Sequence, residues 1–66
     1  MQYRIDRLNN IYIRLNDDGS TLLIKIEQHR ITRVLRNDSN DWIMIYINYS
    51  HSNKREFEEA EKLARI

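Results

Sequence analysis

The chain has 66 residues, with 11 Lys and Arg against 10 Asp and Glu, no cysteine, no proline and one glycine. These figures predict one small domain and exclude disulfide scaffolds and cysteine-based zinc sites. The longest apolar run, Trp42 to Ile47, is far shorter than the roughly 18 residues that a membrane span needs. No leader-like segment opens the chain, so we expect a cytoplasmic protein with no membrane partner.

The small size of the chain also bears on its oligomeric state. A core of this size supplies only about 3–5 kcal/mol, and small natural domains usually add disulfides, a metal or a partner subunit. Cysteine is absent and no metal motif is visible, which leaves association. We therefore expect a homo-oligomer, with a dimer as the simplest case.

Residues 11–27 predict a β-hairpin, because apolar residues alternate with polar ones on either side of turn-forming residues 16–19. The alternating apolar residues are Ile11, Ile13 and Leu15 on one arm and Leu22, Ile24 and Ile26 on the other. Residues 1–10 fit an edge strand that turns at Asn9 and Asn10 into this hairpin, and a short helical turn is the alternative.

A second hairpin is expected over residues 31–49. Residues 31–36 would form one arm, the polar run 37–41 the turn, and residues 42–49 the other arm, since they are rich in β-branched and aromatic side chains. Ile43, Ile45, Ile47 and Tyr49 would lie on one face of this last strand and Trp42, Met44, Tyr46 and Asn48 on the other. Both faces are largely apolar, so the strand needs cover on both sides.

The C-terminal segment predicts an amphipathic helix. Asn53 with Glu56 three residues later fits a capping box, and an apolar stripe follows at helical spacing. The stripe consists of Phe57, Ala60, Leu63 and Ala64. The expected fold class is thus α+β: an antiparallel β-meander of four to five strands with one C-terminal α-helix packed on one face. The helix would meet Ile11, Ile13, Leu22, Ile24, Ile26, Ile43, Ile45 and Ile47.

No pattern in the chain predicts catalysis. His29 and His51 lack metal-ligand spacing, and Ser50, His51 and Ser52 suit turn and capping duty before a helix better than a catalytic triad. The single glycine, Gly19, excludes a glycine-rich phosphate loop. We therefore expect no enzyme, no catalytic residues, no metal and no cofactor.

The apolar second face of residues 42–49 predicts an interface instead, formed by Trp42, Met44, Tyr46 and Asn48. The expected function is that of a small non-catalytic binding protein that occupies the surface of a partner protein. In size and character the chain is similar to the small inhibitors that phages make against host defence proteins, a likeness that no shared motif carries.

The charge distribution supports a second function class. Residues 1–36 carry a net charge of +3 and residues 37–66 one of −2. Five basic or titratable residues, Lys25, His29, Arg30, Arg33 and Arg36, could bind the phosphates of a nucleic acid or a nucleotide. The acidic helix face, Glu56, Glu58, Glu59 and Glu61, could compete for a basic nucleic-acid channel, or simply favour the helix dipole and solubility.

Overall fold

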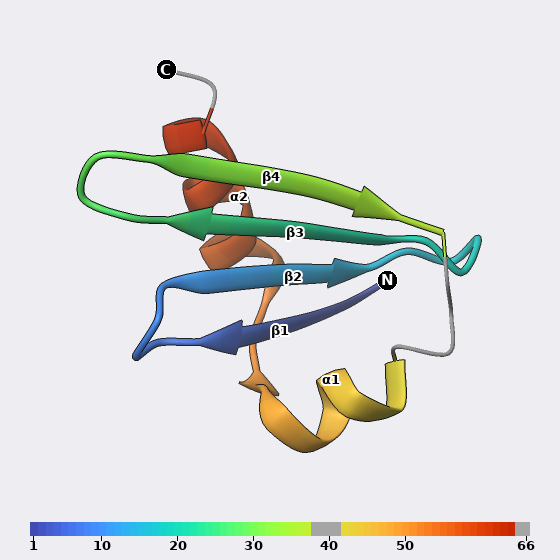
Figure 1. Cartoon of the computed structure of the whole chain (residues 1–66). Helices are drawn as coiled ribbons and strands as arrows, with labels where there is room; N and C mark the ends of the chain where they lie inside the picture. Colours follow the sequence, from blue (N-terminus) through green and yellow to red (C-terminus); the bar gives the residue numbers. More distant parts are fainter. Residues whose placement is uncertain (38–41, 65–66) are drawn as a thin grey trace.

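A five-stranded antiparallel sheet with two helices makes up the protein in a computed structural model that describes residues 1–37 and 42–64 (Figure 1). The strands are β1 (Gln2–Asp6), β2 (Ile11–Leu15), β3 (Thr21–Ile26), β4 (Ile31–Arg36) and β5 (Ser50–His51). The helices are α1 (Trp42–Asn48) and α2 (Lys54–Ala64). The strand order is β4-β3-β2-β1-β5, which confirms the predicted α+β meander with a C-terminal helix. Neither helix in the described part of the chain is long and apolar enough to cross a membrane.

The first ten residues form a strand and a turn, as expected. Strand β1 pairs along its length with β2, and Asn10 takes the positive φ of 53° that asparagine tolerates at a turn. However, β1 is not an edge strand, because Ser50 and His51 pair with Ile5 and Arg4 on its other side.

The β2–β3 hairpin is confirmed, but its alternating apolar residues do not all lie on the face that α2 covers. A five-residue loop joins the strands: the Asn16 amide donates to the Ser20 carbonyl over 2.9 Å, and Gly19 has a φ of 90°. Leu15 therefore pairs with Thr21, and Ile13 with Leu23. Since paired residues share a face, Ile13 lies on the opposite face of the sheet from Ile24. The prediction of one common face for all the hairpin's alternating residues was wrong.

The sheet consequently has two apolar faces, each with its own cluster of buried residues. One cluster joins Ile13 and Leu15 to Ile45 of α1. The other joins Leu22 and Ile24 to Phe57 of α2. Figure 1 shows this arrangement, with the strands passing in front of α2 and with α1 below β1.

The predicted strand over residues 42–49 is wrong: Trp42–Asn48 is helix α1. The run is apolar throughout, so alternation could not distinguish strand from helix. Packing favours the helix. A helical turn brings Trp42, Ile45 and Tyr49 onto one side of the segment. There they pack against Ile13 and Leu15. The predicted second hairpin is therefore absent. Its turn, apart from Asn37, lies outside the described residues.

Helix α2 begins as the capping pattern predicts. The Asn53 Oδ1 atom accepts the Glu56 amide over 2.9 Å, and the Asn53 amide group donates to Glu56 Oε1 over 3.4 Å. Phe57 and Ala60 are buried on the sheet, and the Phe57 ring lies 5.7 Å from that of Tyr3. The prediction fails for Leu63, which is 52% exposed and lies at the side of the stripe, whereas Ala64 packs against the cluster of Leu22, Ile24 and Phe57.

Candidate protein-binding surface

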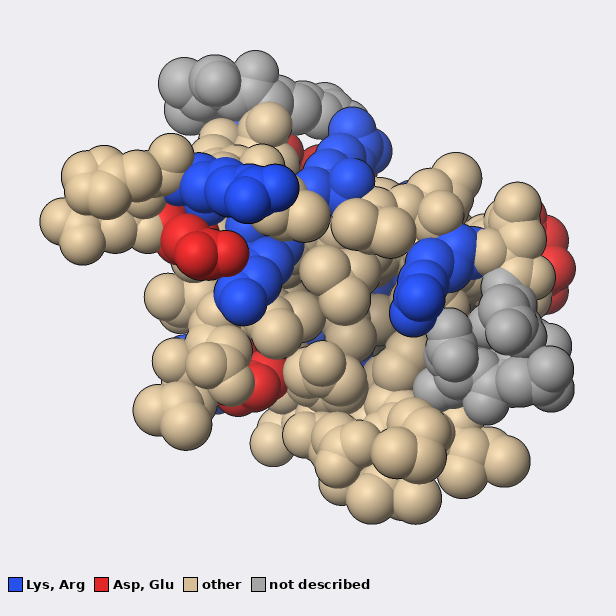
Figure 2. Space-filling view, in the orientation of Figure 1, with Lys and Arg blue, Asp and Glu red and all other residues tan. Residues whose placement is uncertain are grey.

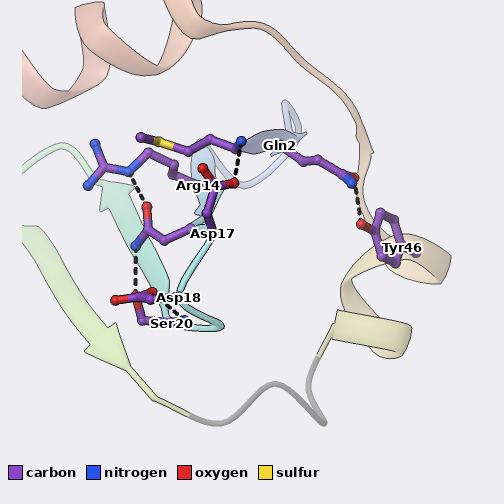
Figure 3. A network of polar contacts seen from close by, with 8 residues as sticks. Gln2, Arg14, Asp17, Asp18, Ser20 and Tyr46 are labelled. Atoms are coloured by element: carbon purple, nitrogen blue, oxygen red, sulfur yellow. Dashed lines mark hydrogen bonds and ion pairs between the residues drawn. The ribbon is translucent and has the colours of Figure 1, made fainter.

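Helix α1 is held on the sheet by polar contacts from its two aromatic side chains. The Trp42 Nε1 atom donates to the Thr21 hydroxyl over 3.2 Å. The Tyr46 hydroxyl donates to the Gln2 Oε1 atom, a contact visible in Figure 3, and the Arg4 guanidinium lies 4.4 Å from the centre of the Tyr46 ring. These contacts fix which side of α1 faces the sheet.

The other side of α1 faces solvent and is mostly apolar. We call it the α1 outer surface; it consists of Ile43, Met44, Ile47 and Asn48. Ile43 is 69% exposed, Ile47 71% and Met44 59%. Figure 2 shows no acidic or basic side chain over this part of the molecule, whereas lysines and arginines lie over the strands. A helix that is apolar on all sides is normally buried, so this exposure is unusual.

A hollow of about 220 Å³ adjoins the α1 outer surface. Helix α1 covers mainly β1 and β2 on its side of the sheet. The space beside α1, over β3 and β4, therefore stays open. The lining residues are Ile13, Thr21, Leu23 and Arg36 from the sheet and Met44, Ile45, Asn48 and Tyr49 from α1 and the residue after it. The hollow is too small for most cofactors, but it has room for one or two side chains of a partner.

The structure divides the four predicted interface residues into two pairs. Met44 and Asn48 lie on the α1 outer surface and also line the hollow. Trp42 and Tyr46 instead attach α1 to the sheet. Ile43 and Ile47 were missed, because an alternating strand would have placed them in the core with Ile45. Polar residues 38–41 are of the types that start helices as well as turns, and that signal could have revealed α1.

The predicted phosphate-binding residues are spread over the sheet. Arg33 shares a face with Ile24 and α2, and its guanidinium lies 3.5 Å from the Glu61 carboxylate. Lys25 faces the opposite side, 3.7 Å from Glu27. Arg36 ends β4, at the far end of the strand from Arg30. His29 lies with Gln28 in the β3–β4 turn.

The acidic helix face is largely matched by cations of the same chain. Both terminal nitrogens of Arg7 contact the carboxylate oxygens of Glu56, at 2.9 and 3.1 Å. Glu61 pairs with Arg33. Glu58 and Glu59 pair one turn back, with Lys54 at 3.7 Å and with Arg55 at 3.6 Å. These pairs fit the interpretation that the carboxylates favour the helix dipole and solubility.

The most ordered polar cluster lies in the β2–β3 turn (Figure 3). The Arg14 Nε atom donates to Asn16 Oδ1 over 2.7 Å, and the Asn16 amide group donates to the Ser20 hydroxyl over 2.9 Å. The hydroxyl and the amide of Ser20 both donate to the Asp18 carboxylate, which lowers the pKa of Asp18 below its usual 3.8. This cluster stabilises the turn.

Within residues 1–37 and 42–64, no three His, Asp or Glu side chains gather closely enough to hold a metal ion. Comparison with known proteins adds no further guide: no protein family, no curated protein and no solved structure matches the chain. The α1 outer surface with its hollow is therefore the feature from which a function is argued.

Proposed function

We propose that this chain is a small non-catalytic binding protein, which acts by covering the surface of a partner protein with the α1 outer surface. One observation carries the proposal: a helix without any charged residue exposes Ile43, Met44 and Ile47 to solvent. Isolated exposed apolar residues are ordinary, but a contiguous set beside a hollow is typical of an interaction site.

The dimensions of the molecule fit this use. A standard interface covers about 800 Å² on each partner, and the whole chain exposes 4903 Å². A partner would thus cover the α1 outer surface, the hollow and the neighbouring part of the sheet. The matching surface would be an uncharged apolar groove that receives a short helix, with an apolar side chain that enters the hollow.

A matched pair of substitutions tests the proposal. Ile47→Asp places a carboxylate in the centre of the α1 outer surface, and Leu63→Asp places one at a comparably exposed position of α2, across the sheet. Tagged wild type and both variants would be used to capture proteins from the cells that naturally make this chain. We expect one discrete protein with wild type and Leu63→Asp, reduced at least tenfold with Ile47→Asp. Equal capture by both variants would refute the proposal.

Two finer hypotheses from the sequence stay predictions. The phosphate-binding alternative receives less support from the structure, because Arg33 and Lys25 lie on opposite faces and each has a carboxylate close by. Binding of a nucleic acid or nucleotide through these residues would weaken steeply as the salt concentration rises. Binding of a partner protein through the α1 outer surface is expected to depend little on salt. Inhibition of the partner, as by phage inhibitors, would follow where the covered surface is itself a functional site.

A further inference from the structure

We propose that β4 pairs antiparallel with β4 of a second copy of this chain, with Val34 of each copy facing the other at the two-fold axis. This inference is independent of the α1 outer surface and makes a dimer with one continuous sheet. The two edges of the sheet differ in how much open backbone they offer. Strand β5 has only two residues, whereas β4 has six, and no strand within residues 1–37 and 42–64 pairs with its outer side.

Strand β4 has only part of the usual protection of an open edge, namely the charged side chains of Arg33 and Arg36. Ile31, Val34 and Leu35 are all exposed, and the chain has no proline that could block pairing. The strand pairs with β3 over its full length without interruption. A long and partly apolar edge of this kind is normally covered, either by another element or by another chain.

The backbone of β4 shows which residues can form the new hydrogen bonds. The Glu27 amide donates to the Arg30 carbonyl over 2.8 Å, so these two residues form a hydrogen-bonded pair that closes the hairpin. Such pairs alternate along an antiparallel ladder. The backbone groups of Thr32 and Val34 therefore point to β3, and those of Ile31, Arg33 and Leu35 point outward from the open edge.

A two-fold pair of β4 strands must place residues of the same face opposite each other, which leaves few registers. A register centred on Arg33 sets the two Arg33 side chains directly against each other, and like charges in that position destabilise a sheet. The register centred on Val34 pairs Arg33 with Leu35 of the second copy, in both directions. It also brings the outward groups of Ile31 opposite those of Asn37, which adds further hydrogen bonds.

The side chains fit the Val34-centred register on both faces of the sheet. On the α1 side, Val34 continues a row with Leu23 and Ile13, so the two copies would form one apolar row across the joined sheets. On the α2 side, Arg33 keeps its contact with Glu61 while its methylene groups cover Leu35 of the second copy.

Single cysteines test both the dimer and its register, because the chain has no cysteine of its own. Val34 residues that face each other in a non-hydrogen-bonded pair lie about 4.5 Å apart at Cα, within the range of a disulfide. Residues 33 and 35 have no such self-contact in this register. Under mild oxidation we expect Val34→Cys to form a covalent dimer at least tenfold faster than Arg33→Cys or Leu35→Cys.

A mixing experiment gives a second readout that does not depend on oxidation. Val34→Glu and Val34→Lys should each be monomeric in sedimentation, because each sets like charges at the axis. Their equimolar mixture should form a dimer, because the axis then joins opposite charges. A monomeric wild type, faster cross-linking at position 33 or 35, or Glu and Lys variants that remain dimeric would each overturn the proposal. A failure of the dimer proposal would not affect the capture experiment with Ile47→Asp and Leu63→Asp, which tests the α1 outer surface separately.

Discussion

At the scale of single residues, the helix that carries the proposed binding surface depends on two aromatic side chains. The indole of Trp42 and the phenol of Tyr46 each have a polar partner on the sheet, Thr21 and Gln2. Aromatic side chains of this kind combine an apolar body with one polar atom, so they can anchor a short helix over a sheet. They anchor α1 within the chain, and their role as contacts for a partner stays a prediction.

The Asp18 carboxylate gives a residue-scale prediction about pH. Hydrogen bonds from Ser20 lower its pKa in the folded state, so they stabilise the fold above about pH 3.8, the usual pKa, and this contribution is lost as the pH falls through the lowered pKa. We expect Ser20→Ala to raise the pKa of Asp18, measured by carboxyl carbon NMR, and to reduce the free energy of unfolding more at pH 5 than at pH 2. Ser20→Thr, which keeps the hydroxyl, is the control. An equal loss at both pH values would show that the carboxylate is not involved.

At the scale of elements, the difference between strand and helix in residues 42–48 can be measured directly. A strand would give Ile45 and Ile47 the same face, whereas helix α1 buries Ile45 and exposes Ile47. We expect Ile45→Ala to reduce the free energy of unfolding by about 2–4 kcal/mol, and Ile47→Ala to change it by less than about 0.5 kcal/mol. Urea unfolding followed by circular dichroism would measure both, and similar losses in the two variants would contradict the helix.

The elements differ in how well the sequence predicts them, for a physical reason. The β2–β3 hairpin and α2 have amphipathic patterns with a turn or a cap, so local chemistry determines their type. The segment at residues 42–48 is apolar on every side, so only its packing on Ile13 and Leu15 decides its conformation. The face of each hairpin residue also depended on the length of the loop at Asn16–Ser20, which the alternating pattern does not reveal.

At the scale of the whole molecule, each face of the sheet carries one helix, α1 on one face and α2 on the other. The homo-oligomer was expected from the small size of the core, and the interface from an apolar strand over residues 42–49 with one helix to cover it. Because residues 42–48 form α1, the second expectation no longer has that strand as its basis. Association is now argued from two other surfaces, the open edge of β4 and the α1 outer surface. Val34 at the β4 edge is not one of the residues of the α1 outer surface, so substitutions there test the dimer separately from the partner.

Site-specific photo-crosslinking tests the central claim, that α1 meets a partner protein, most directly. A photoreactive amino acid would replace Ile47 in one variant and Leu63 in another, and both would be irradiated inside the cells that naturally make the chain. We predict one discrete adduct with a foreign protein from position 47 and none from position 63. The claim would be contradicted by no adduct at position 47, by the same adducts at both positions, or by an adduct at position 47 with the mass of two copies of this chain.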